Sequence, residues 1–170
     1  MRILVDIILA ALLALATPAD ALRLTAPAYL THEAAIEHRF SAAIAGAAFA
    51  IDHNLLLAIA FRESRYSYRE RTRETNGWSC GAMTPTPTRN AALCIWASSS
   101  PLNGYLHGAE HLRKWLNVAR GNMRAAHLGY AGGFLLIRYC SNPTNNVDYR
   151  CHVPAIAEAR AVWIRDGVKP

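Results

Sequence analysis

Apolar residues recur at helical spacing over much of the chain. Residues 33–50 are rich in alanine, lack proline and place an apolar residue at every third or fourth position, which predicts an amphipathic helix. Asp52 can cap a second helix by accepting hydrogen bonds from the free amides of its first turn. The run from Leu55 to Phe61 is apolar on every face, so we expect this second helix to pass through the centre of the core.

The segment 64–87 breaks this pattern. It carries tyrosines, arginines and the turn-forming pair Asn76-Gly77, which predicts a long excursion with a short β-hairpin. Helical spacing returns in four later segments: 88–97, 105–119, 122–130 and 154–164. Residues that favour helix ends support these boundaries, namely Thr88 and Asn122 as N-caps, Pro154 in a first turn, and Gly121 and Gly167 at helix stops. The predicted fold is mainly α-helical.

The amino terminus resembles an export signal. Met1-Arg2 precedes an apolar run over residues 3–16, interrupted by Asp6 and shorter than a membrane-spanning helix. Ala19 and Ala21 offer a cleavage site. We therefore expect a signal peptide over residues 1–21, a single domain over 22–170, and a periplasmic or secreted location. An uncleaved membrane anchor and a misassigned start codon are the alternatives.

Composition fits one exported domain. The chain has 170 residues, of which 52% are hydrophobic, and a formal net charge of +6, so it can bury one core but hardly two. The arginines are scattered and interleaved with glutamates, which favours a solvated positive face over a nucleic-acid site. We expect no nucleic-acid partner, an anionic or wall-like one instead, and a monomer.

Four cysteines fall in two locally spaced pairs. In a chain that reaches an oxidising compartment this spacing favours disulfides Cys80–Cys94 and Cys140–Cys151 among the three possible pairings. A zinc site that uses these cysteines with His152 is the competing interpretation, but the chain has no metal-binding knuckle with C-x-x-C spacing. We expect no metal and no cofactor.

Glu63 is the main candidate for chemistry. It follows Ile59 by four residues and Leu56 by seven, so it continues the apolar stripe at the carboxyl end of the buried helix. Burial and the helix dipole both raise the pKa of a carboxyl group there, which suits a proton donor near neutral pH. A glycosidic oxygen needs such a donor before it can leave. The alternative is a structural ion pair with Arg62, Arg65 or Arg113.

The segment Ile51–Tyr66, with its Glu63-Ser64 pair, resembles the opening motif of lytic transglycosylases of the soluble, goose-lysozyme-like class. Downstream, Gly81-Ala82-Met83-Thr84 resembles the Gly-Leu-Met-Gln segment of that family, with Thr84 in place of the Gln. Gly129-Tyr130-Ala131-Gly132-Gly133 resembles Ala-Tyr-Asn-Ala-Gly, with Ala131 in place of the Asn. The resemblance covers about residues 32–164.

The resemblance implies a lysozyme-like α+β fold with a central buried helix, and Glu63 as the catalytic acid/base. Cleavage of the MurNAc-GlcNAc β-1,4 bond of peptidoglycan would leave a 1,6-anhydromuramyl end, because the muramyl 6-hydroxyl is the nucleophile. The expected substrate-binding residues are Ser64, Tyr66, Met83, Thr84, Tyr130 and Ala131. Tyr66, with Tyr68 and Trp78, also offers a flat face for a sugar ring. A secretion, conjugation or pilus machine is a further expected partner.

Two other functions stay open at this point. If Glu70, Glu74 or Asp148 lies across the groove and positions a water molecule, the enzyme would be a lysozyme-type hydrolase. A non-catalytic glycan-binding module on the same scaffold is the second alternative, with Thr84 and Ala131 as signs of an eroded site. A membrane-damaging protein is disfavoured, because no long basic amphipathic helix with an aromatic side is present.

Overall fold

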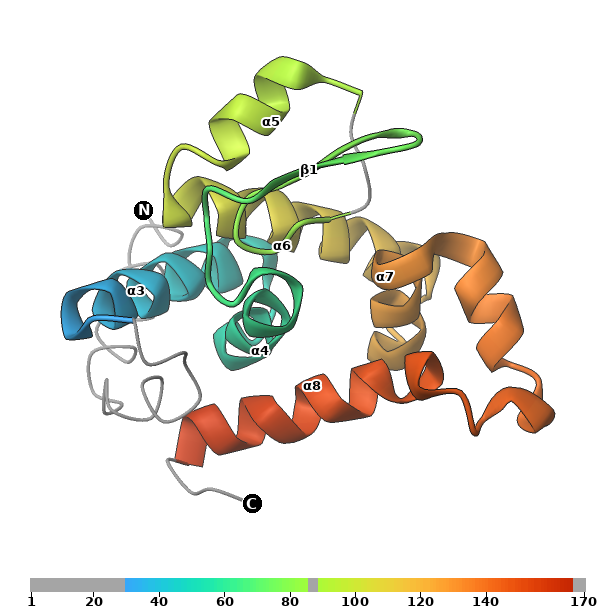
Figure 1. Cartoon of the computed structure of the whole chain (residues 1–170). Coiled ribbons are helices and arrows are strands. Elements are labelled where there is room, and N and C mark those ends of the chain that lie inside the picture. Colours follow the sequence, from blue (N-terminus) through green and yellow to red (C-terminus); the bar gives the residue numbers. More distant parts are fainter. Residues whose placement is uncertain (1–29, 86–88, 167–170) are drawn as a thin grey trace.

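A computed structural model describes residues 30–85 and 89–166. Within these residues it contains six α-helices, one 3₁₀ turn and one two-stranded antiparallel sheet (Figure 1). The prediction of a mainly α-helical fold with a small β-hairpin is confirmed. The signal-peptide prediction falls on residues 1–21, which lie outside the described residues.

The first two helices begin and end at residues suited to those positions. Helix α3 (His32–Phe49) begins after Thr31, whose hydroxyl accepts a hydrogen bond from the Ala34 amide. Helix α4 (His53–Ser64) begins after Asp52, which accepts one from the Asn54 amide at 2.9 Å, as predicted. The predicted helix over 33–50 therefore forms with its boundaries shifted by one residue at each end.

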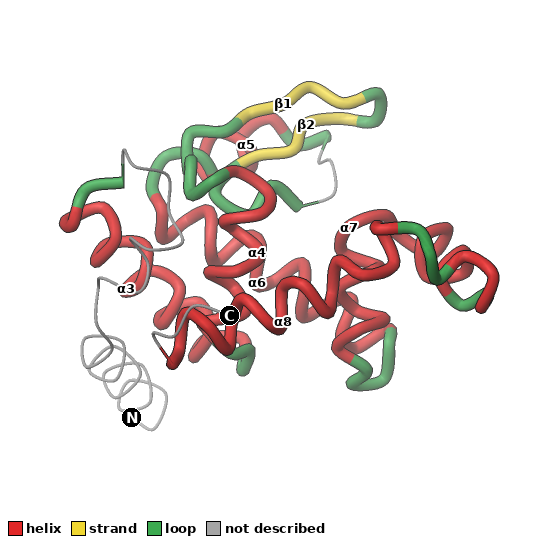
Figure 2. Tube along the Cα trace, turned by 60° about the horizontal axis from the view of Figure 1, so that its bottom comes forward, coloured by secondary structure: helices red, strands yellow, loops and turns green. Residues whose placement is uncertain are grey.

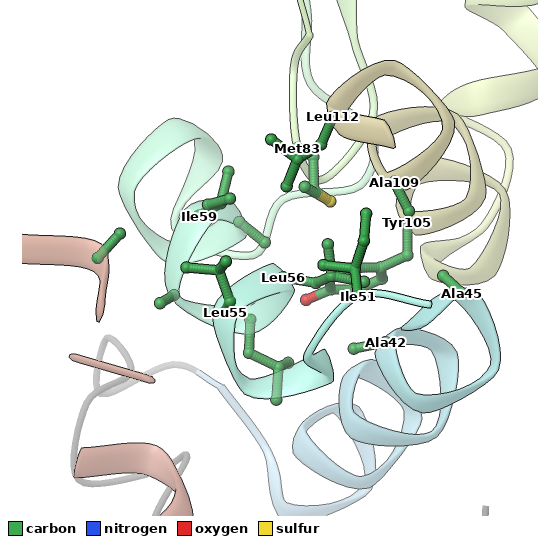
Figure 3. Close-up of a cluster of buried hydrophobic side chains, with 14 of the residues drawn as sticks. Ala42, Ala45, Ile51, Leu55, Leu56, Ile59, Met83, Tyr105, Ala109 and Leu112 are labelled. Carbon is green, nitrogen blue, oxygen red and sulfur yellow. The ribbon is translucent and has the colours of Figure 1, made fainter. Parts of the chain in front are cut away.

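Helix α4 lies at the centre of the molecule. It packs against α3, α6 (Pro101–Val118) and α8 (Tyr149–Asp166) (Figure 1). Leu56, Leu57 and Ile59 are fully buried, which confirms the prediction of a core-spanning helix. In Figure 3 the side chains of Leu56 and Ile59 face Met83 and the α6 residues Tyr105 and Leu112. The core is thus built around the helix that carries Glu63.

The hairpin forms within the predicted excursion. Strand β1 (Arg71–Glu74) pairs with β2 (Gly77–Cys80), with Thr72 opposite Ser79 and Glu74 opposite Gly77. The disulfide Cys80–Cys94 attaches the end of β2 to α5 (Ala91–Ala97). Figure 2 shows the hairpin and α5 together on one side of the molecule.

Three predicted helix starts are wrong. Helix α5 begins at Ala91 after the N-cap Asn90, and Thr88, the predicted cap, lies outside the described residues. Helix α6 begins at Pro101, four residues before the predicted start, because Ser100 caps it. Helix α8 begins at Tyr149, so Pro154 lies inside the helix and not in its first turn.

Helix α7 (Met123–Cys140) has two limbs. Asn122 caps it, as predicted, but the helix does not end at Tyr130. Gly132 and Gly133 leave the helical conformation, and Gly133 has a φ of 67°, which glycine adopts without a steric cost. The second limb leads through η1 (Pro143–Asn145) into α8.

The second disulfide, Cys140–Cys151, joins the end of α7 to the first turn of α8. Both predicted pairings are therefore confirmed, and all four cysteines are oxidised. A zinc site with cysteine ligands is excluded, because none of the thiols is available. Among the described residues, no helix is both long and apolar enough to cross a membrane.

Candidate active site

The end of α4 sets the position of Glu63. Arg65 and Tyr66 both adopt positive φ angles, 54° and 68°, so the chain turns sharply directly after Ser64. Glu63 therefore stands in the last helical turn, and its side chain is 21% exposed. The side chain is mostly buried but keeps one opening to solvent.

That opening leads into a cavity of about 460 Å³. Three parts of the fold supply its walls: the end of α4, the hairpin with its flanking segments, and the start of the kink in α7. The lining residues are Glu63, Glu70, Thr72, Glu74, Ser79, Thr84, Tyr130, Ala131 and Gly132. The structure thus brings three predicted substrate-binding residues, Thr84, Tyr130 and Ala131, to the same cavity as Glu63.

The serine and threonine hydroxyls of this cavity donate to its carboxylates. Thr72 Oγ1 donates to Glu70 Oε1 at 3.1 Å, and Ser79 Oγ donates to Glu74 Oε1 at 3.4 Å. Thr84 Oγ1 donates to Glu63 Oε2, also at 3.4 Å. A hydroxyl has one hydrogen to donate, so these side chains present mainly acceptor oxygens to the cavity. Such walls suit a ligand rich in hydroxyl donors.

Opposing effects act on the acidity of Glu63. Burial raises the pKa of its carboxyl group above the ordinary value, because it penalises the charged form. The guanidinium of Arg62 and the hydroxyl of Thr84 act against this shift. The net effect is an increase, as the sequence predicted.

Glu63 also forms the ion pair that the sequence left open. Arg62 Nη1 lies 2.5 Å from Glu63 Oε1. The other two candidate partners are engaged elsewhere: Arg113 Nε donates to the carbonyl oxygen of Phe49 at 2.7 Å, and the Arg65 guanidinium lies over the Phe61 ring. The carboxylate is therefore both paired and open to the cavity.

Buried contacts hold the wall that faces Glu63. Tyr130 is 2% exposed, and its hydroxyl donates to the Met83 carbonyl at 2.6 Å. Ser64 Oγ donates to the Ala82 carbonyl at 2.6 Å and so ties the end of α4 to the same segment. Met83 is fully buried in the core. Ser64 and Met83 thus support the cavity from behind and are not among its lining residues.

Three aromatic side chains lie away from this cavity. Tyr66 is 3% exposed and packs against His38 and Phe61 in the core, with ring centroids 5.3 and 5.6 Å away. Tyr68 packs against the same core, and Trp78 lines a separate pocket beside α5. The prediction that these residues form sugar platforms finds no support in their positions.

The candidate second carboxylates separate into two groups. Glu70 and Glu74 line the cavity, whereas Asp148 lies at the corner between α7 and α8. There Asp148 binds Arg150 and accepts a hydrogen bond from Tyr139, and these contacts lower the pKa of its carboxyl group. Asp148 is therefore not a partner for Glu63 in this cavity.

Sequence reasoning did not identify Thr72, Ser79 and Gly132 as lining residues. Thr72 and Glu74 are two residues apart on β1, and Ser79 is the cross-strand partner of Thr72, so all three share one face of the hairpin. Strand alternation could have identified this face once the register was known. The described residues include no group of three metal-binding side chains that could hold an ion.

No protein-family model, curated protein or solved structure matches the chain.

Proposed function

We propose that this chain is an exported enzyme that cleaves the MurNAc-GlcNAc β-1,4 bond of peptidoglycan, with Glu63 as acid and base. The observation that carries the proposal is the position of Glu63. Its carboxyl group has a raised pKa and opens into a cavity lined with hydroxyls and carboxylates. A carboxyl group of this kind can protonate a glycosidic oxygen, while the acceptor-rich walls bind sugar hydroxyls.

In the proposed reaction, protonated Glu63 gives its proton to the bridging oxygen, and the bond between this oxygen and the muramyl C1 breaks. The resulting Glu63 carboxylate then removes the proton from the muramyl 6-hydroxyl, whose oxygen bonds to C1. This step closes the 1,6-anhydro ring and returns Glu63 to its protonated form. The reaction consumes no water and needs no second catalytic carboxylate.

Hydrolysis is the second candidate reaction, and one observation favours it. Glu70 and Glu74 line the same cavity as Glu63. A carboxylate across the cavity can hold a water molecule for attack on C1 while Glu63 acts as the acid. The products would then carry a reducing end in place of the anhydro ring.

The test is digestion of purified peptidoglycan by the disulfide-bonded chain, with the soluble products identified by mass spectrometry. Glu63→Gln keeps the shape of the side chain but cannot donate a proton. Glu110→Gln is the matched control, because Glu110 lies on the exposed face of α6 in an ion pair with Lys114. We expect anhydromuropeptides from the wild type and the control but not from Glu63→Gln.

Other results of the same digestion would support one of the alternative functions. Reducing-end products that disappear in Glu63→Gln indicate a hydrolase, and Glu70→Gln and Glu74→Gln then identify the water-binding carboxylate. Binding to peptidoglycan without any Glu63-dependent release indicates a non-catalytic glycan-binding module. Two disulfides agree with an oxidising, extracytoplasmic compartment. A secretion, conjugation or pilus machine remains the proposed physiological partner.

A further inference from the structure

The ion pair between Arg62 and Glu63 conflicts with an acid role for Glu63. Arg62 Nη1 lies 2.5 Å from Glu63 Oε1, and a charge-assisted hydrogen bond of this kind favours the ionised carboxylate. A general acid has to hold its proton until the substrate arrives. If Glu63 acts as an acid, Arg62 has to leave the carboxylate during the reaction. Its guanidinium then requires another hydrogen-bond acceptor.

His127 on the first limb of α7 offers a second acceptor for Arg62. It is 1% exposed, and its Nε2 has no hydrogen-bond partner in the part of the chain that the structure describes. An unsatisfied buried polar atom destabilises the folded state, so a donor that could reach Nε2 would stabilise the protein there. The His127 ring lies edge-on to the ring of Tyr130, a cavity residue, with centroids 6.4 Å apart.

The charge of Arg62 affects the acidity of His127. Burial lowers the pKa of His127 to about 4, and the positive charge of Arg62 contributes to this decrease. His127 is therefore neutral at neutral pH. A neutral imidazole has one nitrogen with a free lone pair, and the guanidinium has five N–H donors. With its proton on Nδ1, His127 can accept a hydrogen bond from Arg62 at Nε2.

The ionisable groups around His127 do not repel an approaching Arg62. On the α6 side, His111 packs against the Tyr130 ring at 5.4 Å, and burial lowers the pKa of His111 to about 4 as well. Tyr130 donates its hydroxyl to the Met83 carbonyl. On the hairpin side, Glu70 and Glu74 accept hydrogen bonds from hydroxyls. Near neutral pH, His111 and His127 therefore bring no positive charge that would repel Arg62.

We propose that Arg62 is a movable counter-ion that transfers from the Glu63 carboxylate to Nε2 of His127 when a glycan occupies the cavity. The inference rests on the proposed function, because it assigns the event that lets Glu63 take up its proton from solvent. The carboxylate takes up this proton as the glycan enters and before the glycan displaces the last water, and the glycan then offers an oxygen that needs a donor. Arg62 and His127 are positioning residues here, and neither contacts the reacting atoms.

The test is an NMR titration of the Glu63 side-chain carboxyl in the disulfide-bonded chain labelled with ¹³C. It is run without ligand and with a saturating hexamer of N-acetylglucosamine. In the wild type we expect the hexamer to raise the pKa of Glu63 by about one pH unit or more. In Arg62→Met we expect a high pKa already without ligand, because the counter-ion is gone, and little further increase with the hexamer.

Two substitutions at His127 separate its role as an acceptor from its role in packing. His127→Phe fills the space without an acceptor, so the increase caused by the hexamer should be lost. His127→Gln supplies an amide oxygen that can accept from Arg62, so the increase should be retained. In the double variant Arg62→Met/His127→Phe, the titration should match that of Arg62→Met alone. Thermal unfolding of each variant confirms that it is folded, and Arg62→Met tests the proposal even if His127→Phe does not fold.

The outcomes distinguish this inference from the proposed function. If the hexamer binds, as amide shifts around the cavity report, but the Glu63 titration stays unchanged, Arg62 does not move and the inference is overturned. It is overturned equally if His127→Phe shows the full wild-type increase, or if Arg62→Met leaves the free titration unchanged. If the hexamer does not bind and peptidoglycan is not digested, the proposed function itself fails.

Discussion

Arg62 and Glu63 are consecutive residues on one helix, yet their side chains meet at 2.5 Å. Consecutive helical residues normally point about 100° apart around the axis and do not face each other. The contact therefore depends on the length of the arginine side chain, which bends round the last turn of α4. Arg62 remains 32% exposed, so a rotation about its side-chain bonds can break the pair without any movement of the helix.

The first prediction concerns protein stability. Because the pKa of Glu63 is raised in the folded state, ionisation of Glu63 destabilises the fold as the pH rises above the ordinary carboxyl pKa. Glu63→Gln removes this penalty. We expect Glu63→Gln to have a higher urea midpoint than the wild type at pH 7, and the difference to shrink at pH 4, where the carboxyl group is mostly protonated in both states.

Glu110→Gln serves as the control for this measurement. It removes an exposed ion pair with Lys114 four residues away on the same helix, so its free energy of unfolding should equal that of the wild type or be lower by at most about 0.5 kcal/mol. A lower midpoint for Glu63→Gln at pH 7 would show that the Arg62 pair outweighs the cost of burying the carboxylate.

The second prediction concerns the contact between α6 and the cavity wall. A Cβ atom at Gly108 would lie 2.5 Å from the Cβ of Met83 and 2.6 Å from its sulfur, so the Met83 segment would have to shift. We expect Gly108→Ala to lower stability by about 1–3 kcal/mol and to slow peptidoglycan digestion, because Met83 anchors Tyr130. Thermal unfolding measures the first effect. Lys114→Ala, on the exposed face of α6, should change stability by no more than about 0.5 kcal/mol.

The third prediction compares the two disulfides. They join residues 14 and 11 positions apart, and each is worth about 3 kcal/mol from loop closure. The double substitutions Cys80→Ser/Cys94→Ser and Cys140→Ser/Cys151→Ser should therefore lower the melting temperature by similar amounts. Only the first pair holds the hairpin wall of the cavity, so its loss should reduce digestion far more than loss of the second. Equal losses of activity would mean that the hairpin needs no covalent attachment.

Much of the fold follows from the sequence because apolar periodicity and capping residues act locally. The central helix, the hairpin and both disulfides are of this kind. The errors arise where a local signal has two meanings. Pro154 is tolerated at a helix start, but α8 accommodates it in its interior. Two consecutive glycines after Tyr130 suggest a helix stop, whereas α7 bends there and continues to Cys140.

The candidate site was predictable only in part. Glu63 could be found because a carboxylate on an apolar helical stripe is a local anomaly. The resemblance implies a substrate-binding role for Tyr66, but two left-handed residues place its ring in the core. The hydroxyls of Thr72 and Ser79 reach the cavity through the register of the hairpin, and the orphaned Nε2 of His127 depends on packing between distant helices. Neither relationship is visible in the sequence.

If the proposed function is correct, the Cys80–Cys94 bond also separates synthesis of this protein from the onset of its activity. The helix that carries Glu63 is held by the core, whereas the facing wall is a hairpin of two four-residue strands fastened by that bond. A two-stranded hairpin alone is only marginally stable in water. A chain kept reduced would therefore keep Glu63 in place on its helix but lack a stable hairpin wall beside it. Under the proposed function, oxidation would act as a maturation step, and the chain would not digest peptidoglycan until the bond forms.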